Sequence, residues 1–172
     1  MVKHHWSVRV LHWVMAVVVI AAFAAVFYRG ELDDGDARQF WLDIHRTIGL
    51  GTLLLVLLRV AVRGLFGHDQ VPSASMPRWI RLGAAVSHFL LYLALFSIPV
   101  LGWLLSSAKA RHFKLFDHTL PSLVAKNPEL ADRLHGWHMA AAWGLLCLLA
   151  LHVLGALYHY LIRRDQVLQS ML

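Results

Sequence analysis

Four long apolar runs, separated by shorter polar stretches, organise this sequence. They cover residues 7–28, 43–66, 83–106 and 134–162, and the second run starts as early as Arg38 if its polar beginning is included. Each run reaches the roughly 20 residues that a helix needs to cross a bilayer, and each is uncharged at its centre. The pattern predicts an all-α integral membrane protein, a four-helix bundle of four transmembrane helices that forms one domain over residues 1–172.

The first run has a second interpretation, because small residues follow its apolar stretch (AAFAAVF) as they do in a secretory signal peptide. Cleavage there would remove His12 from the mature protein. The run is long enough to span a bilayer, however. We therefore expect it to be retained as the first transmembrane helix.

The composition supports a membrane location. Hydrophobic residues make up 59% of the 172 residues, charged residues only 15%, and the mean hydropathy is +0.58, which is more apolar surface than a soluble domain of this size can bury. The formal net charge is +6, but the basic residues gather at the ends of the apolar runs, where they suit lipid headgroups better than nucleic acid. The single cysteine, Cys147, excludes an internal disulfide, and the lack of a CxxCH motif means that any haem is bound non-covalently.

The distribution of charge in the loops predicts the topology. The loop after the first run is acidic (RGELDDGDAR), whereas residues 63–81 are basic. Because positive residues in short loops stay inside, we expect a multi-pass membrane protein with both termini in the cytoplasm. Residues 107–133 form the longest loop, which is interrupted by Pro121 and Pro128, and we predict a short interfacial helix at residues 120–124.

Histidines are the most informative polar residues within the apolar runs. His138 and His152 are fourteen residues apart on the last run. At about 100° per residue their side chains point to within about 40° of the same direction, with a rise of about 21 Å between them. Two imidazoles on one face inside a membrane are costly unless something binds them.

Two other histidines lie at matching depths. In the expected topology His45 lies near the outer end with His138, and His12 lies near the cytoplasmic end with His152. Paired neutral imidazoles suit the two axial positions of an electron-transfer haem, so we predict two haems b, with these four histidines as the iron ligands. One such histidine alone could equally be a hydrogen-bonded residue between helices, but four at matched depths favour the cofactor.

Further polar residues at the cytoplasmic end suggest a cofactor contact and a substrate site. Arg59 follows His45 by fourteen residues on the same face and could pair with a haem propionate or serve as an interface anchor. His88 and His159 approach the inner haem from the third and fourth runs. Because histidines exchange protons near neutral pH, we predict that these two bind a quinone, with bonding to headgroups or propionates as the alternative.

The long outer loop carries a cationic patch within the sequence AKARHFKLF. Its members are Lys109, Arg111 and Lys114. Such a patch can steer a small anion or an acidic protein toward the outer haem, although most charged stretches of this kind are simply solvated.

The histidine-bearing segments resemble those of the bacterial cytochrome b561 family over essentially the whole chain. The segments are VLHW around His12, DIHRTIGLG around His45, SHFLLYLALFSIPVLG around His88, and HGWHMAAAWGLLCLLALHVLGALYHYLIRRD from His135 onward. The chain is similar to stand-alone members of that family, which oxidise superoxide and reduce ubiquinone. This resemblance implies the same four-helix fold, the same four haem ligands, and a ubiquinone region at His88 and His159. It also implies a place in the bacterial inner membrane.

These inferences predict an oxidoreductase of the superoxide:ubiquinone type. Periplasmic superoxide would be drawn in by the cationic patch, and ubiquinone would be reduced near the inner haem with cytoplasmic protons. Superoxide, ubiquinone and membrane lipid are the expected partners, and nucleic acid is not. Three alternatives stay open: a cytochrome b subunit that relays electrons for a partner dehydrogenase or hydrogenase, a ferric or ascorbate-linked reductase, and a histidine-lined metal transporter without haem. Outer loops of at most 27 residues and a short C-terminal tail offer little surface for a partner to dock on, which favours the stand-alone enzyme.

Overall fold

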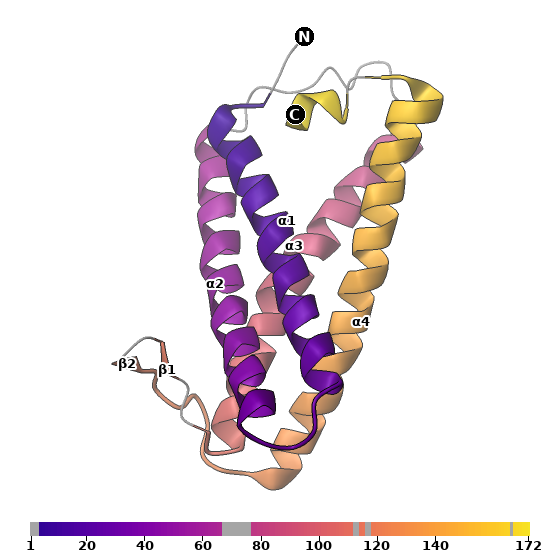
Figure 1. Cartoon of the computed structure of the whole chain (residues 1–172). Coiled ribbons are helices and arrows are strands. Elements are labelled where there is room, and N and C mark those ends of the chain that lie inside the picture. Colours follow the sequence, from indigo (N-terminus) through magenta and orange to yellow (C-terminus); the bar gives the residue numbers. More distant parts are fainter. Residues whose placement is uncertain (1–3, 67–76, 112–113, 116–117, 166) are drawn as a thin grey trace.

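Four long helices build the molecule, and the computed structural model describes residues 4–66, 77–111, 114–115, 118–165 and 167–172. The helices are α1 (Trp6–Gly30), α2 (Asp36–Phe66), α3 (Arg78–Ala108) and α4 (Pro128–Tyr158), shown in Figure 1. All four are long and apolar enough to cross a membrane, which confirms the prediction of four spans.

The helices are longer than the apolar runs that predicted them. Polar first turns extend α2, α3 and α4, which begin at Asp36, Arg78 and Pro128. At the start of α4 the Asn127 side chain accepts a hydrogen bond from the Leu130 amide at 3.0 Å, and Pro128 occupies the first turn, where no amide hydrogen is needed. The apolar run therefore marks the part of each helix suited to the bilayer, and at α4 a capping residue marks the true start.

The helices pack unevenly around the bundle. α1 packs along α2, α3 packs along α4, and α2 contacts α3, but α4 has no comparable contact with α1 or α2 among the described residues. α1 and α4 spread apart toward the end that carries both chain termini (Figure 1). A small core cluster of Val19, Leu91 and Leu145 ties α1, α3 and α4 together. Most other large apolar side chains face outward, as lipid-exposed positions do.

The long loop differs from its prediction. No helix forms at residues 120–124; the segment runs in an extended and bent path, preceded by a two-residue antiparallel ladder of β1 (Lys114–Leu115) and β2 (His118–Thr119). The Pro121 carbonyl accepts a hydrogen bond from the Trp103 indole at 3.1 Å, and the Leu123 amide donates to the Ser107 hydroxyl at 3.1 Å. The predicted helix was wrong because these backbone groups are bound by the end of α3.

The C-terminal tail closes the opposite end of the bundle. After α4 the chain makes a π-helical turn (His159–Arg163), reverses, and forms a short 3₁₀ helix (Gln169–Met171). The Trp13 indole donates to the Met171 carbonyl at 3.0 Å, and Arg9 donates to the Leu172 carbonyl, so the tail lies on α1. Both termini thus lie at one end (Figure 1), as an even number of crossings requires.

Candidate functional site

Two pairs of histidine rings bridge α4 to its distant neighbours. The rings of His45 on α2 and His138 on α4 have centroids 6.3 Å apart and planes 85° apart. The rings of His12 on α1 and His152 on α4 have centroids 6.1 Å apart and planes 65° apart. All four side chains are half-buried. The structure therefore brings together the same partners that the depth argument paired.

The spacing of these rings fits a metal between them. Two imidazoles that bind one metal from opposite sides have centroids about 6 Å apart, because a metal–nitrogen bond is about 2 Å long and the ring centre lies about 1 Å behind its nitrogen. Both pairs lie between helices that do not pack closely on each other. Two protein ligands per site suit a porphyrin iron, and no group of three or more His, Cys, Asp or Glu side chains placed to hold a bare metal ion occurs in the described part of the chain.

Backbone carbonyls orient both rings of the pair formed by His45 and His138, the outer pair in the predicted topology. His45 Nδ1 lies 2.9 Å from the Ala22 carbonyl oxygen, and His138 Nδ1 lies 3.1 Å from that of Ile98. A carbonyl oxygen can only accept, so Nδ1 donates in each ring and Nε2 is left with a free lone pair for a metal. A Cβ on Gly102 would lie 3.3 Å from His138 Cε1. The absence of a side chain there lets the His138 ring reach α3.

A buried guanidinium lies beside the pair formed by His12 and His152, the inner pair in the predicted topology. The Arg59 side chain donates from Nε to the Tyr92 hydroxyl at 3.0 Å and from its terminal nitrogen to the Val8 carbonyl at 3.5 Å. It is only 7% exposed and within electrostatic reach of His12 and His152. No carboxylate pairs with it among the described residues, and a buried charge with only neutral partners suits an anionic ligand such as a haem propionate.

The structure separates the two histidines predicted to bind a quinone. The His88 ring lies against His152, with centroids 5.4 Å apart, so three histidines gather at the inner end. His159 instead contacts Tyr158 and Asp165, and no contact with His88 is found in the described part of the chain. Each histidine therefore has its own surroundings, and a quinone would have to lie between them to touch both.

The end of the bundle opposite the chain termini, which the predicted topology places outside, is rich in positive charge. Lys109 and Arg111 line a pocket of about 350 Å³ together with Lys126 and Asp132. The side chain of Lys114, the third member of the predicted patch, lies outside the described residues. Two further arginines, Arg29 and Arg46, lie within electrostatic reach of Arg111 and of each other.

Several site residues escaped the sequence analysis. The carbonyls of Ala22 and Ile98 carry no signal, because every residue has one. Gly102 does carry a sequence signal, since a glycine inside a long helix is unfavourable unless a close contact requires it. Asp165, directly after the Arg163–Arg164 pair, is an acidic residue at a basic membrane boundary, which is a second signal that could have been read.

Comparison with known proteins finds relatives that match nearly the whole chain. The family model described as prokaryotic cytochrome b561 matches residues 3–172. Cytochrome b561 homolog 2 of Escherichia coli K12 is 29% identical over 94% of this chain and 86% of its own length. The probable superoxide oxidase CybB of Yersinia pestis is 26% identical over 94% and 91%, and cytochrome b561 homolog 1 of E. coli K12 is 23% identical over 94% and 92%.

Proposed function

This chain belongs to the prokaryotic cytochrome b561 family, a family of haem-binding membrane electron-transfer proteins, and we propose that it is a superoxide oxidase that delivers electrons to ubiquinone through two haems b. The name of the Yersinia pestis relative supports superoxide as the electron donor. In this role the chain is a bacterial multi-pass membrane oxidoreductase with its termini in the cytoplasm.

The four paired histidines hold the two haems in this proposal. His45 and His138 would bind the outer iron, and His12 and His152 the inner iron, each through Nε2. The haems supply reversible one-electron chemistry, which suits a donor that gives up single electrons. Arg59 would pair with a propionate at the inner end.

The proposed reaction balances with two superoxide anions for each quinone. Each superoxide loses one electron and leaves as dioxygen, and the quinone gains two electrons and two protons to become a quinol. Lys109 and Arg111, with Lys114 on the same loop, would raise the local concentration of the anion at the outer end. His88 and His159 would bind the quinone oxygens at the inner end, where protons enter from the cytoplasm.

The observation that carries the proposal is the pair of ring spacings, 6.1 Å and 6.3 Å, at opposite ends of one helix. Stopped-flow absorption spectroscopy of the purified, oxidised protein tests it. We expect superoxide to reduce the haem bands rapidly, an excess of superoxide dismutase to abolish that reduction, and a short-chain ubiquinone analogue to reoxidise the reduced protein.

Two results would contradict the proposal. Haem bands that respond to dithionite but not to superoxide would remove superoxide as the donor, and co-purification of a stoichiometric soluble dehydrogenase would then favour the relay subunit. A colourless preparation would remove the haems, and with them the whole proposal.

A further inference from the structure

The turn that follows α4 brings an acidic side chain onto His159. The π-helical turn (His159–Arg163) ends at Arg164, which has a left-handed backbone with φ of 53°. This reversal lets the Asp165 amide donate to the His159 carbonyl at 3.2 Å. A left-handed conformation is uncommon outside glycine, and π-turns occur often at functional sites. The local backbone is therefore shaped to place Asp165 beside His159.

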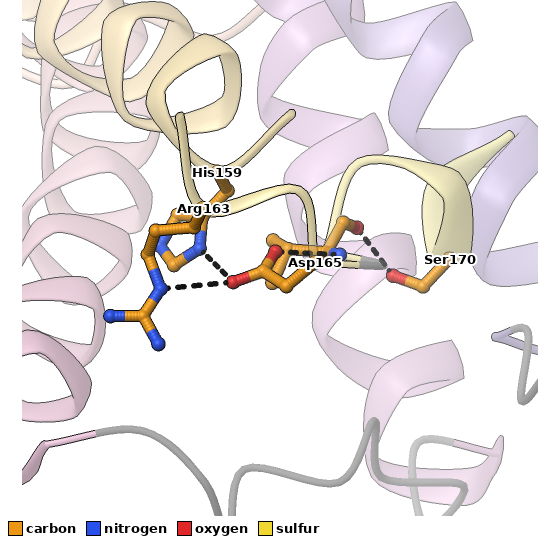
Figure 2. Close-up of polar contacts among 5 residues, drawn as sticks. His159, Arg163, Asp165 and Ser170 are labelled. Carbon is orange, nitrogen blue, oxygen red and sulfur yellow. Dashed lines mark hydrogen bonds and ion pairs between the residues drawn. The ribbon is translucent and has the colours of Figure 1, made fainter. Parts of the chain in front are cut away.

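The Asp165 carboxylate binds three groups, two of which are side chains (Figure 2). His159 Nδ1 lies 2.6 Å from Oδ2, and Arg163 Nε donates to the same oxygen at 3.2 Å. The Val167 amide donates to Oδ1 at 3.3 Å. Burial raises the pKa of Asp165, but the bonds from His159, the Val167 amide and Arg163 outweigh it, so the pKa of this carboxyl lies below its ordinary value. The group is an anion at neutral pH and accepts from Nδ1, which leaves His159 Nε2 for another partner.

The position of His159 relates this pair to the proposed quinone site. His159 follows His152 by seven residues, so it lies on nearly the same face of the chain's last span, about 10 Å further toward the cytoplasmic end. The His159 side chain is 12% exposed and that of Asp165 is 25% exposed. The histidine is thus mostly buried, while its carboxylate partner is more exposed.

We propose that Asp165 is a positioning residue that holds His159 as the proton donor to the bound quinone. This inference rests on the proposed quinone site and assigns the two residues different roles there. His159 touches the quinone through Nε2. Asp165 acts through His159 by orienting the ring and by stabilising the imidazolium form, as carboxylates do for catalytic histidines.

In the proposed proton transfer, His159 is the donor and the quinone oxygen that it contacts is the acceptor. As the quinone takes up its electrons, the Nε2–H bond of the imidazolium breaks and an O–H bond forms on the quinone oxygen. The neutral imidazole then regains a proton from cytoplasmic water. Arg163 keeps the carboxylate anionic throughout, because its guanidinium stays bound to Oδ2.

Oxidation of the dithionite-reduced protein by a ubiquinone analogue isolates this step from superoxide chemistry. We expect Asp165→Asn to lower the rate at saturating quinone by about 10- to 100-fold, because an amide cannot stabilise the imidazolium. The KM for quinone should stay close to that of the wild type, and the solvent deuterium isotope effect should increase because proton transfer becomes limiting. Asp165→Glu should restore part of the rate.

The control is Ser170→Ala, which removes the bond from the Ser170 hydroxyl to the Val167 carbonyl at 2.7 Å in the same tail without touching Asp165. It should react at the wild-type rate. A wild-type rate for Asp165→Asn, or an equal loss in both variants, would overturn the inference. If the Asn variant lost its haem, Asp165→Ser would give the same comparison. A wild-type protein that quinone does not oxidise would instead refute the proposed function.

Discussion

The two ends of the bundle, called outer and inner after the proposed topology, hold their paired imidazoles in different ways. At the outer end, main-chain carbonyls of Ala22 and Ile98 bind Nδ1 of His45 and His138 at 2.9 Å and 3.1 Å. At the inner end no carbonyl binds the rings of His12 or His152 in the described part of the chain. Side chains surround that pair instead: the ring of His88 and the guanidinium of Arg59.

This difference indicates at which end single substitutions can change the surroundings of the histidine rings. A carbonyl is present whatever residue occupies its position, so the outer rings keep their orientation through most sequence changes. The inner rings depend on particular side chains, which can rearrange when a substrate binds but are also lost by single substitutions. We therefore expect the outer end to be robust except at its ligands and at Gly102, and the inner end to be sensitive at several positions.

Removal of one predicted iron ligand from either end should have the largest effect, and it tests whether the two ends hold separate haems. His138→Ala and His152→Ala should each lose about half of the bound haem, because an iron without its second imidazole is weakly held. His138→Ala should abolish reduction by superoxide but leave the inner haem spectrum. His152→Ala should still be reduced by superoxide but fail to pass electrons to quinone. Haem content by pyridine haemochrome and low-temperature spectra measure this, and loss of both haems in both variants would contradict two separate sites.

Arg59→Gln is the next largest change and affects the inner end alone. The reduced haem carries one more negative charge, so the removal of a buried cation should lower the inner midpoint potential by on the order of tens of millivolts. Redox titration of the two haems measures the shift. Arg59→Lys should keep most of the potential but lose the fork that binds a carboxylate.

Arg63→Gln is the matched control for Arg59, since Arg63 lies one turn later on α2 and is exposed to solvent. Arg63 is within electrostatic reach of His88, but solvent screens its exposed charge, so the shift of the inner potential should be clearly smaller than in Arg59→Gln. An equal shift in the Arg63 and Arg59 variants, or a shift of the outer haem in Arg59→Gln, would count against the assignment of Arg59 to the inner site.

Neutralising the outer cations should give a smaller, salt-dependent effect. The double variant Lys109→Gln with Arg111→Gln should slow reduction by superoxide about 10-fold at low ionic strength, because steering of an anion is weakened. The difference should shrink as salt is added. Stopped-flow rates across a salt series measure it, and the double variant Arg78→Gln with Arg81→Gln, at the opposite end of α3, provides a control of the same charge change. A salt-independent loss would contradict steering.

Gly102→Ala should have the smallest effect, restricted to the outer end. Its new Cβ would lie 3.3 Å from His138 Cε1, so the ring must move away from the Ile98 carbonyl, and overpacking of this kind costs about 1–3 kcal/mol. We expect a changed electron paramagnetic resonance signal for the outer haem and an unchanged one for the inner haem. Gly83→Ala, also on α3 but with nothing within 4 Å of the added carbon, should leave both signals unchanged.

Much of the fold was predictable because it depends on the length of each apolar run and on the constant rise of a helix, both of which follow from the order of residues. The length of each apolar run predicted four crossings, and the constant rise of a helix converted the numbers of His138 and His152 into depths. Those depths paired them with His45 and His12. The same reasoning was wrong for residues 120–124, because the fate of that segment depends on Trp103 and Ser107 from another helix.

The sequence by itself therefore determined the membrane class, the number of spans and which histidines share a level. Only the tertiary structure decided how the helices rotate and which groups face each other at each level: the carbonyl of Ile98 on His138, His88 against His152, and Asp165 on His159. The physical reason is that depth follows from residue number through the helix rise. Which groups meet at one depth depends on how the helices pack and on turns such as that at Arg164. Neither produces a repeating pattern of residues in the sequence.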